Sequence, residues 1–201
     1  GVLIDSRDMH YHSLNDALYK VDEKYVINRE EHLASYDGLS TTKKLQMLTK
    51  NKGLDTKYYD QVWTDKQKAT FELIKKIPHR SDLVKLFQLI KSEGIKIAVA
   101  SNSVRETVKL ALMSIGVMEF VDYYVSNEDV TNHKPFPEMY WKCMTTLRVL
   151  PKHTVIIEDS HIGREGAINS GAHLVPVKNA DDLGLDKIEK CLDILNDKHH
   201  K

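Results

Sequence analysis

The amino-acid sequence predicts an α/β protein with a doubly wound, Rossmann-like parallel sheet and an inserted all-helical cap. From about residue 81 onward, short apolar runs alternate with segments of helical periodicity. Strands joined through helices form parallel sheets with right-handed crossovers. Residues 13–77 show helical periodicity with little strand signal. We therefore expect an α/β core made of residues 1–12 and 79–201, with residues 13–78 forming the helical cap.

The helical region is predicted to contain four helices, the second of which follows Asn28 and stops at Tyr36-Asp37-Gly38. Ser13 or Asn15 is placed to cap the first, in which Leu14, Leu18 and Val21 share one face. Glycine commonly ends a helix, and proline cannot continue one. Two further helices are expected, from Ser40 or Thr41 to Gly53 and from Asp55 to the residues before Pro78.

The α/β region is predicted to contain four short strands separated by helices. Each strand is an apolar run of four to six residues between turn signals. In open α/β sheets, ligands bind beyond the carboxyl ends of the strands, so the residues that follow each strand are the first candidates for a site. The expected strands are residues 95–100, 121–125, 154–157 and 173–177.

Composition excludes several classes of protein. The 201 residues are 41% hydrophobic, and 29 basic residues balance 29 acidic ones. This composition is too apolar for a disordered chain, and the zero net charge offers no general argument for binding nucleic acid or an anionic membrane. No run approaches the roughly 18–20 apolar residues of a membrane span. Cys143 and Cys191 match no metal-site spacing, so we expect a reduced, cytoplasmic protein. The oligomeric state stays open.

Small polar side chains follow the first predicted strand, in the order Ser101, Asn102 and Ser103. A hydroxyl group there, together with backbone N–H groups that open the next helix, is able to hold an anionic oxygen. The alternative interpretation is an ordinary helix cap.

Two adjacent carboxylates, Glu158 and Asp159, follow the third predicted strand. Hard oxygen ligands suit Mg²⁺, which takes one or two protein carboxylates together with substrate phosphate. Capping of the next helix is again the alternative. Between these two sites, Pro135 and Pro137 restrict the backbone beside Lys134. A lysine held near a carboxylate pair is suited to neutralise a transferring phosphoryl group, although a solvated loop lysine is the simpler interpretation.

Taken in order, these segments resemble the motifs of the haloacid dehalogenase-like superfamily, in its branch of sugar-phosphate mutases and small-molecule phosphatases. Gly1-Val2-Leu3-Ile4-Asp5-Ser6 with His10 is similar to the second half of the first motif and the flap. The later motifs are matched by Ala98-Val99-Ala100-Ser101-Asn102, His133-Lys134-Pro135 and Ile156-Ile157-Glu158-Asp159-Ser160.

The resemblance implies a role for each matching residue. Ser101 would bind the transferring phosphoryl oxygen with Asn102 nearby, and Lys134 would balance charge between nucleophile and phosphate. Glu158 and Asp159 would hold Mg²⁺. The cap would close over a small phosphorylated metabolite and exclude water.

The resemblance also implies a nucleophilic aspartate, and a second aspartate two residues later, on a first core strand that would end just before Gly1. Asp5 and Asp8 do not match those positions. Three explanations stay open: the strand precedes this chain, the protein is an inactive relative that binds a ligand, or another chain supplies the strand.

The predicted function is hydrolysis of small phosphate monoesters through an aspartyl-phosphate intermediate. In the loop of residues 36–41, Asp37 and Thr41 stand where the mutases usually carry basic residues, which favours a phosphatase. Residues 41–80 hold ten Lys and Arg against four Asp and Glu, and solvated helix faces explain this excess most simply. A sugar phosphomutase and a catalytically inactive scaffold are the alternatives.

Overall fold

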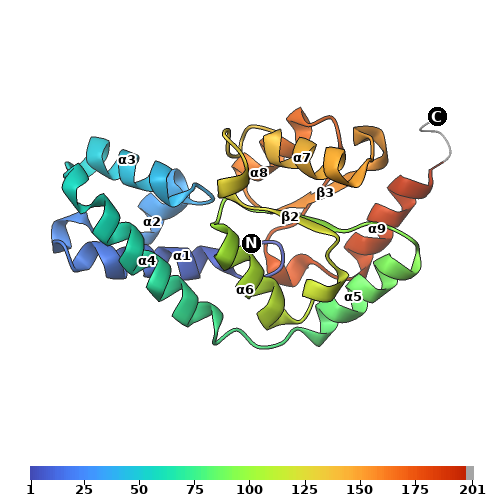
Figure 1. Ribbon diagram of the computed structural model, residues 1–201, viewed down its shortest axis with the longest axis horizontal. Coiled ribbons are helices and arrows are strands. Elements are labelled where there is room, and N and C mark those ends of the chain that lie inside the picture. The colour runs from blue at the N-terminus through green and yellow to red at the C-terminus, as the bar shows by residue number, and fades with distance from the viewer. Residues whose placement is uncertain (198–201) are drawn as a thin grey trace. The chain divides into compact units, whose positions relative to one another are not determined.

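The computed structural model describes residues 1–197, which form two compact units (Figure 1). One unit contains residues 6–77 and is helical, and the other contains residues 1–5 and 78–197 and is α/β. The predicted division, with its first boundary after residue 12, would fall inside the first helix, which runs from Ser6 to Tyr19. Within residues 1–197, no helix has both the length and the apolar character needed to cross a membrane.

The helical unit is built on three long helices, and α1 and α4 pack along each other. Its interior is apolar, with Leu14, Leu18 and Leu48 fully buried. Short helical segments connect the long ones. The helices are α1 (Ser6–Tyr19), α2 (Arg29–Glu31), α3 (Thr41–Lys52) and α4 (Tyr59–Ile74), with 3₁₀ turns at Glu23–Tyr25 and Thr56–Tyr58 and a π-helical turn at His32–Tyr36.

Helix α1 begins earlier than predicted, at Ser6. Ser13 does not cap it: the Ser13 hydroxyl is buried and donates to the carbonyl oxygen of Met9 at 2.6 Å, one turn back. Asn15 also lies inside the helix, where its amide group bonds both the N–H and the carbonyl of Ile27. Both residues therefore lie inside the helix, and the predicted cap at Ser13 or Asn15 is wrong.

The ends of the two later helices agree with the prediction. The Ser40 hydroxyl accepts a hydrogen bond from the Lys43 N–H at 3.4 Å and caps α3. Gly53 ends α3 with a φ of 69°, a left-handed conformation that glycine adopts without strain. The Asp55 carboxylate accepts from the Lys57 N–H in the 3₁₀ turn that leads into α4.

The α/β unit contains four short parallel strands, each near its predicted position. The first is shorter than expected and begins at Ala98; just before it, the Ile97 carbonyl accepts from the Asp122 N–H at 2.8 Å, while the Ile97 N–H donates to the Asp122 carboxylate at 2.7 Å. The helices surround the strands (Figure 1). The strands are β1 (Ala98–Ala100), β2 (Tyr123–Val125), β3 (Val155–Glu158) and β4 (His173–Pro176), and the helices are α5 (Ser81–Ser92), α6 (Arg105–Ile115), α7 (Glu138–Leu147), α8 (His161–Asn169) and α9 (Leu185–Asn196).

The strands form two parallel pairs, and this differs from the single sheet that we predicted. Ala98 lies opposite Tyr123 in the first pair, and Val155 lies opposite His173 in the second. Within residues 1–197, no strand pairs with the second edge of β1 or of β3. The two pairs nevertheless share a core, because Ala100 of β1 packs into the apolar cluster that contains Ile156 of β3. The predicted first core strand is not among the described strands.

Candidate active site at the carboxyl ends of the strands

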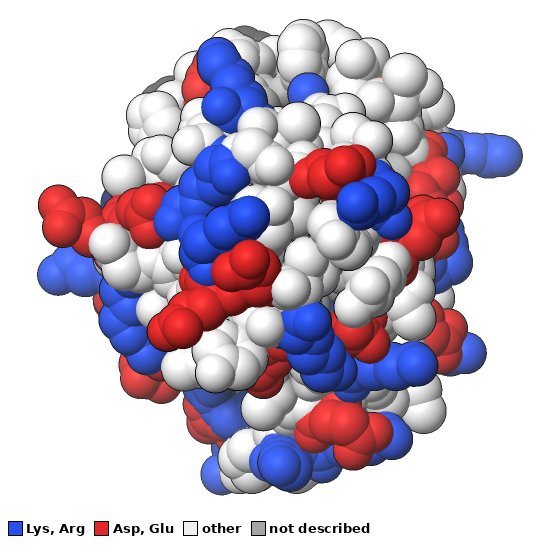
Figure 2. Space-filling view, turned by 90° about the vertical axis from the view of Figure 1, so that its left-hand side faces the viewer, with Lys and Arg blue, Asp and Glu red and all other residues white. Residues whose placement is uncertain are grey.

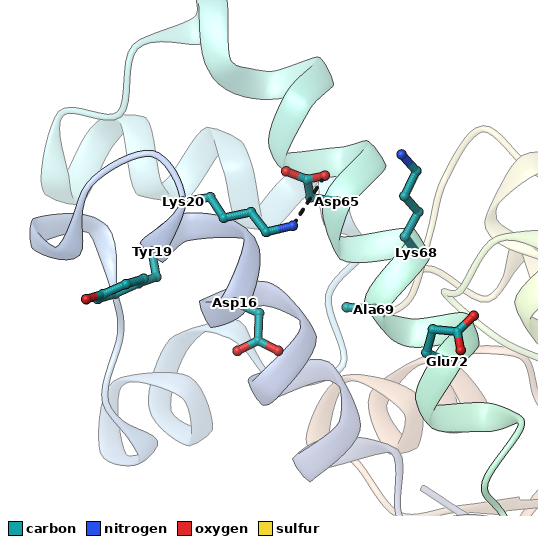
Figure 3. A pocket seen from close by; sticks show the side chains of 7 residues that line it. All are labelled: Asp16, Tyr19, Lys20, Asp65, Lys68, Ala69 and Glu72. Carbon is teal, nitrogen blue, oxygen red and sulfur yellow. Dashed lines mark ion pairs between the residues drawn. The ribbon is translucent and has the colours of Figure 1, made fainter.

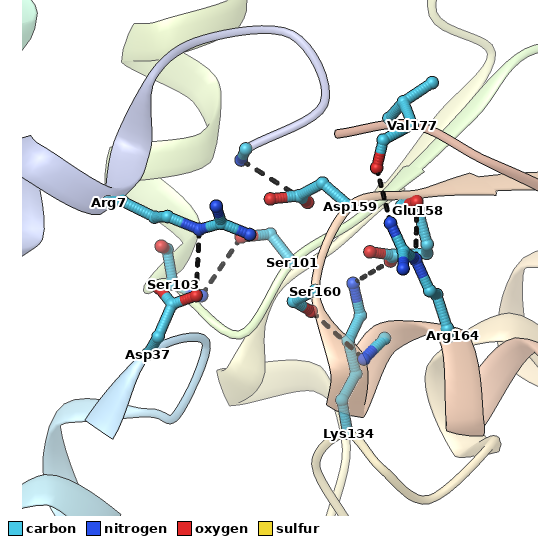
Figure 4. A network of polar contacts seen from close by, with 12 residues as sticks. Arg7, Asp37, Ser101, Ser103, Lys134, Glu158, Asp159, Ser160, Arg164 and Val177 are labelled. Carbon is cyan, nitrogen blue, oxygen red and sulfur yellow. Dashed lines mark hydrogen bonds and ion pairs between the residues drawn. The ribbon is translucent and has the colours of Figure 1, made fainter. Parts of the chain in front are cut away.

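Lys134 occupies the centre of a polar cluster at the carboxyl ends of β1 and β3 (Figure 4). Its ammonium nitrogen donates to the carbonyl oxygen of Ala100 at 2.9 Å and to Glu158 Oε1 at 2.5 Å. Its backbone N–H donates to the Asn102 side-chain oxygen at 3.2 Å. Lys134 is therefore a positioned charge, and the interpretation as a solvated loop lysine is wrong.

Ser101 follows β1 directly, and its backbone N–H donates to the Val125 carbonyl at 3.0 Å, which extends the β1–β2 pair. The Ser101 hydroxyl accepts from the N–H of Ser103 at 3.1 Å (Figure 4). It does not cap α6, which begins at Arg105; the Arg105 N–H donates to the Glu128 carboxylate at 2.6 Å instead. The hydroxyl proton is thus available for an anionic oxygen at the end of β1.

Glu158 ends β3 and is 5% exposed. Its Oε1 atom accepts from Lys134 and also from the Tyr140 hydroxyl at 2.6 Å. Burial alone would raise the pKa of Glu158, but the charge of Lys134 and the two hydrogen bonds outweigh burial and hold that pKa below its usual value. Glu158 is therefore an ionised carboxylate at neutral pH.

Helix α8 begins directly beside this carboxylate. The Ser160 hydroxyl accepts from the Gly163 N–H at 3.1 Å and caps the helix. A Cβ atom on Gly163 would lie 2.3 Å from Glu158 Oε2, so only glycine fits. The partial positive charge of the helix N-terminus favours the negative charge of Glu158.

Asp159 lies next to Gly1, whose nitrogen is 3.9 Å from Asp159 Oδ1 (Figure 4). The approach is close, because a Cβ atom on Gly1 would meet Asp159 Oδ2 at 1.8 Å. The Asp159 side chain is 10% exposed. The structure thus brings together the segment before the first helix and the end of β3.

Two further residues shape this site, and the sequence analysis missed both. Tyr140 on α7 bonds Glu158, and Arg164 on α8 donates to the carbonyl oxygens of Glu158 at 3.5 Å and Val177 at 2.7 Å (Figure 4). Arg164 therefore joins the ends of β3 and β4. Neither residue directly follows a strand, so the sequence analysis, which considered the residues after each strand, did not include them. Tyr140 is buried and Arg164 is half-buried, and each lies on the first turn of its helix.

The two adjacent acids suit a magnesium ion. Carboxylate oxygens are its preferred protein ligands, and one or two suffice when substrate phosphate supplies others. Glu158 and Asp159 provide such a pair at one strand end. Within residues 1–197, no group of three or more His, Cys, Asp or Glu side chains is arranged to hold a metal by itself. Two carboxylates alone leave the other coordination positions of such an ion for water and for substrate oxygens.

In the helical unit, Asp37 lies in the loop that the resemblance associates with substrate. Its carboxylate accepts from Arg7 Nε at 2.9 Å and lies 3.8 Å from the ring of His32. A separate groove of about 450 Å³ runs between α1 and α4, and Lys20 and Asp65 form an ion pair of 3.6 Å across it (Figure 3). This groove contains none of the predicted site residues.

This chain resembles known proteins of one hydrolase family. The profile of the haloacid dehalogenase-like hydrolase family matches residues 1–177. A phosphorylated carbohydrates phosphatase of Thermotoga maritima is 23% identical over 171 residues, which cover 85% of this chain and 78% of that protein. The pyrophosphatase PpaX of Bacillus cereus (strain B4264) is 24% identical over 195 residues, which cover 92% of this chain and 76% of that protein.

The fold has close counterparts among solved structures. The crystal structure of β-phosphoglucomutase from Clostridium difficile matches with a TM-score of 0.81 and 20% identity, covering 96% of this chain and 93% of the other. At this identity the likeness concerns the fold alone. The family match over residues 1–177 shows that this chain belongs to the haloacid dehalogenase-like hydrolases.

Proposed function

We propose that this protein is a Mg²⁺-dependent phosphatase that hydrolyses small phosphate monoesters through an aspartyl-phosphate intermediate. The observation that carries the proposal is the placement of Lys134 between the Ala100 carbonyl and Glu158, with Asp159 beside it. A fixed cation beside carboxylates that are able to hold a metal ion is a recurring arrangement in phosphoryl transfer. Relatives named as phosphatases of phosphorylated carbohydrates and as a pyrophosphatase support the reaction class.

Each site residue has a distinct part in this reaction. The Ser101 hydroxyl and the Asn102 side chain bind oxygens of the transferring phosphoryl group. The ammonium group of Lys134 neutralises charge that the phosphoryl group and the nucleophile bring together. Glu158 and Asp159 hold the metal ion, which supplies further charge neutralisation when bound. Arg164 fixes the loop after β3 through its two carbonyl contacts.

The nucleophile is proposed to be an aspartate on a strand between β1 and β3. Two observations support that place. The second edges of both strands are unpaired within residues 1–197, and Ala98 of β1 is exposed although central strands of such sheets are normally covered. The nitrogen of Gly1 lies beside Asp159, so a residue joined to it would adjoin the metal ligands.

In the first step, the aspartate carboxylate attacks phosphorus, and the bond between phosphorus and the ester oxygen breaks. A second aspartate, two residues later, gives a proton to the departing alcohol. Water then gives a proton to the second aspartate and attacks phosphorus, the bond between phosphorus and the aspartate oxygen breaks, and inorganic phosphate leaves with both aspartates restored to their starting forms.

The test is an assay of phosphate release from a panel of phosphate monoesters with Mg²⁺, using the protein with an Asp-x-Asp strand directly before Gly1. We expect turnover, and we expect Asp159→Ala to abolish it. Asp193→Ala, at an exposed position on α9, is the matched control and should retain full activity. Thermal unfolding of each variant establishes that it is folded.

Three results would contradict the proposal. Binding of phosphate compounds with no hydrolysis of any would identify a binding protein. Return of the phosphate to the sugar, rather than its release to water, would identify a phosphomutase. An unchanged rate in folded Asp159→Ala would remove Asp159 from the metal site.

A further inference from the structure

The two oxygens of the Glu158 carboxylate have different surroundings. Oε1 accepts two hydrogen bonds, one from the Lys134 ammonium group at 2.5 Å and one from the Tyr140 hydroxyl at 2.6 Å. Oε2 accepts no hydrogen bond from any of residues 1–197. Oε2 does not belong to the side-chain atoms of the described chain that are sealed from solvent without a partner, so it keeps some contact with water. One oxygen is therefore occupied by the protein, and the other is open.

Tyr140 is held firmly in the place from which it reaches Oε1. The residue is 5% exposed, and its ring packs into the apolar cluster that contains Ile156 and Ala167. Its hydroxyl oxygen also lies 3.1 Å from the carbonyl oxygen of Gly163. A hydroxyl group has one proton, and an ionised acceptor forms the shorter and stronger hydrogen bond, so this proton goes to Glu158. Tyr140 therefore fixes Oε1 in one orientation.

Lys134 alone would not fix the carboxylate in this way. Its ammonium group has three protons, and one of them goes to the Ala100 carbonyl oxygen at 2.9 Å. Lysine carries a compact charge on a flexible stem, so the ammonium group is able to follow either oxygen of a carboxylate that turns. The hydroxyl of a packed tyrosine ring has no such freedom. Tyr140 is therefore the residue that decides which oxygen of Glu158 stays open.

Helix α8 leaves space beside the open oxygen. A Cβ atom on Gly163 would lie 2.3 Å from Glu158 Oε2 and 2.9 Å from the Ser160 hydroxyl, so a side chain at this position would displace the carboxylate. The N–H of Gly163 already donates to Ser160 Oγ at 3.1 Å. Gly163 thus brings neither a side chain nor a free N–H group to Oε2.

Divalent ions differ in how they use a carboxylate. Mg²⁺ takes six ligands at the corners of a near-ideal octahedron, and these corners lie about 2.9 Å apart at its usual metal–oxygen distances. The two oxygens of one carboxylate are closer together than that, so Mg²⁺ binds a carboxylate through one oxygen. Ca²⁺ is larger and accepts six to eight ligands, including both oxygens of one carboxylate. A carboxylate with a single open oxygen therefore suits Mg²⁺ and withholds a ligand from Ca²⁺.

We propose that Tyr140 is a positioning residue that selects the metal ion: by holding Oε1, it restricts Glu158 to binding through Oε2 alone and so favours Mg²⁺ over Ca²⁺. This inference rests on the proposed function, in which Glu158 and Asp159 hold the metal ion. Tyr140 acts through Glu158, with which it shares a hydrogen bond. All three residues belong to the α/β unit, so the arrangement is complete within that unit.

The first test measures the binding of Mg²⁺ and of Ca²⁺ by calorimetry, without substrate, in the protein used for the phosphatase assay. We expect the preference for Mg²⁺ to fall about tenfold in Tyr140→Phe, the lower end of the range for residues that hydrogen-bond a metal ligand. Phenylalanine keeps the packed ring and removes the hydroxyl. Tyr123→Phe makes the same change on a ring that packs against Val125 and Met139, and it should keep the preference. An unchanged preference in folded Tyr140→Phe would overturn the inference.

Exposed carboxylates add weak binding that this measurement has to exclude. In Figure 2, acidic side chains are interspersed with basic ones over the visible face of the protein. Such exposed groups attract any divalent cation, and salt screens the attraction. Both titrations are therefore recorded at about 0.15 M salt, and the binding that remains in Asp159→Ala is subtracted.

A second measurement observes the carboxylate directly and begins with the unaltered protein. Infrared difference spectra, recorded with ¹³C-labelled glutamate carboxyl groups, distinguish a carboxylate bound through one oxygen from one bound through both. The signal that Glu158→Gln lacks belongs to Glu158. In the unaltered protein we expect binding through one oxygen with either ion, and in Tyr140→Phe we expect binding through both oxygens with Ca²⁺. Binding of Ca²⁺ through both oxygens of Glu158 in the unaltered protein would overturn the inference.

These results distinguish the inference from the proposed function. A preference for Mg²⁺ that is lost in Tyr140→Phe, in a protein that hydrolyses no phosphate monoester, would support the inference and contradict the phosphatase. Hydrolysis with Mg²⁺, together with an unchanged preference in Tyr140→Phe, would contradict the inference alone. The absence of any metal binding that depends on Asp159 would overturn both. Thermal unfolding checks that each variant is folded.

Discussion

The ammonium group of Lys134 and the carboxylate of Glu158 form a buried ion pair, with 2.5 Å between Nζ and Oε1 and side-chain exposures of 9% and 7%. Residues 24 positions apart in the sequence meet here, because the loop before α7 and the end of β3 reach the same edge. The carboxylate is also bonded by Tyr140 on the same oxygen. This pair links the stability of the α/β unit to the electrostatics of the proposed active site.

Lys134→Ala is expected to destabilise the protein by about 3–5 kcal/mol, since it leaves Glu158 buried and without its cation. Urea unfolding measures the loss. The double variant Lys134→Met with Glu158→Gln should recover a large part of it, because no uncompensated charge then remains. A loss below about 1 kcal/mol in the single variant would show that the pair is not buried as described.

Tyr140→Phe is expected to cost about 1.5–3 kcal/mol, the range for a hydrogen bond to a charged group. The same change should raise the pKa of Glu158 towards its usual value of 4.5, since one bond to the carboxylate is lost. A carboxylate whose folded pKa is lowered contributes stability that is present above pH 4.5 and is lost as pH falls through the folded value. The acid-unfolding midpoint of Tyr140→Phe should therefore move to higher pH. Tyr19→Phe, at an exposed position, should leave it unchanged.

Gly163→Ala should destabilise the protein although alanine favours helices. The added methyl group would stand 2.3 Å from Glu158 Oε2, and this carboxylate is held by Lys134 and Tyr140, so it has little freedom to move. Gly53→Ala is a useful comparison, because no atom lies within 4 Å of its Cβ position. There we expect only the cost of the left-handed backbone, about 1–2 kcal/mol. An equal or smaller loss in Gly163→Ala would contradict the described packing.

The stability of the ligand-free protein should rise with pH above about 7. The folded pKa values of Lys66 and Lys44, about 7 and about 8, lie below the ordinary value of 10.5. Between these limits the unfolded chain binds more protons, so each lysine adds a slope of up to about 1.4 kcal/mol per pH unit. Urea unfolding at pH 7, 8 and 9 measures this slope, to which His32, with its pKa lowered to about 4, adds little in this range. Lys66→Met should reduce it, Lys68→Met should not, and a flat profile in the unaltered protein would contradict the burial of both lysines.

Much of the fold could be predicted from local patterns. The caps at Ser40 and Asp55 and the end of α3 at Gly53 are short-range features, each formed by hydrogen bonds within a few residues. The start of α1 was not predictable in this way. Ser13 and Asn15 are typical cap residues, but both lie inside α1, where Ser13 bonds Met9 one turn back in the same helix and Asn15 bonds Ile27 beyond the end of that helix. The helix α9 lies in a stretch for which we made no prediction.

The candidate site was predictable to the extent that its residues follow strands. Ser101, Glu158 and Asp159 were found because parallel strands direct their carboxyl ends to one edge. Lys134 was identified because Pro135 and Pro137 restrict the backbone beside it and because it lies in one of the matched motifs. Tyr140 and Arg164 reach the site from helices, and no rule of spacing connects them to Glu158. The cytoplasmic location inferred from the two cysteines stays a prediction, although both thiols are free and buried.

The sequence by itself determined the class of fold and the order of its motifs, because apolar periodicity and turn residues act over short distances along the chain. The tertiary structure alone decided which charges are paired. Lys134 and Lys44 look alike in the sequence, as lysines within charged or polar segments, and both are buried. One lies 2.5 Å from a carboxylate and the other has no ion-pair partner among residues 1–197. Burial and pairing depend on contacts between distant segments, and the interaction between two charges depends on their separation and on the water around them rather than on their positions in the chain.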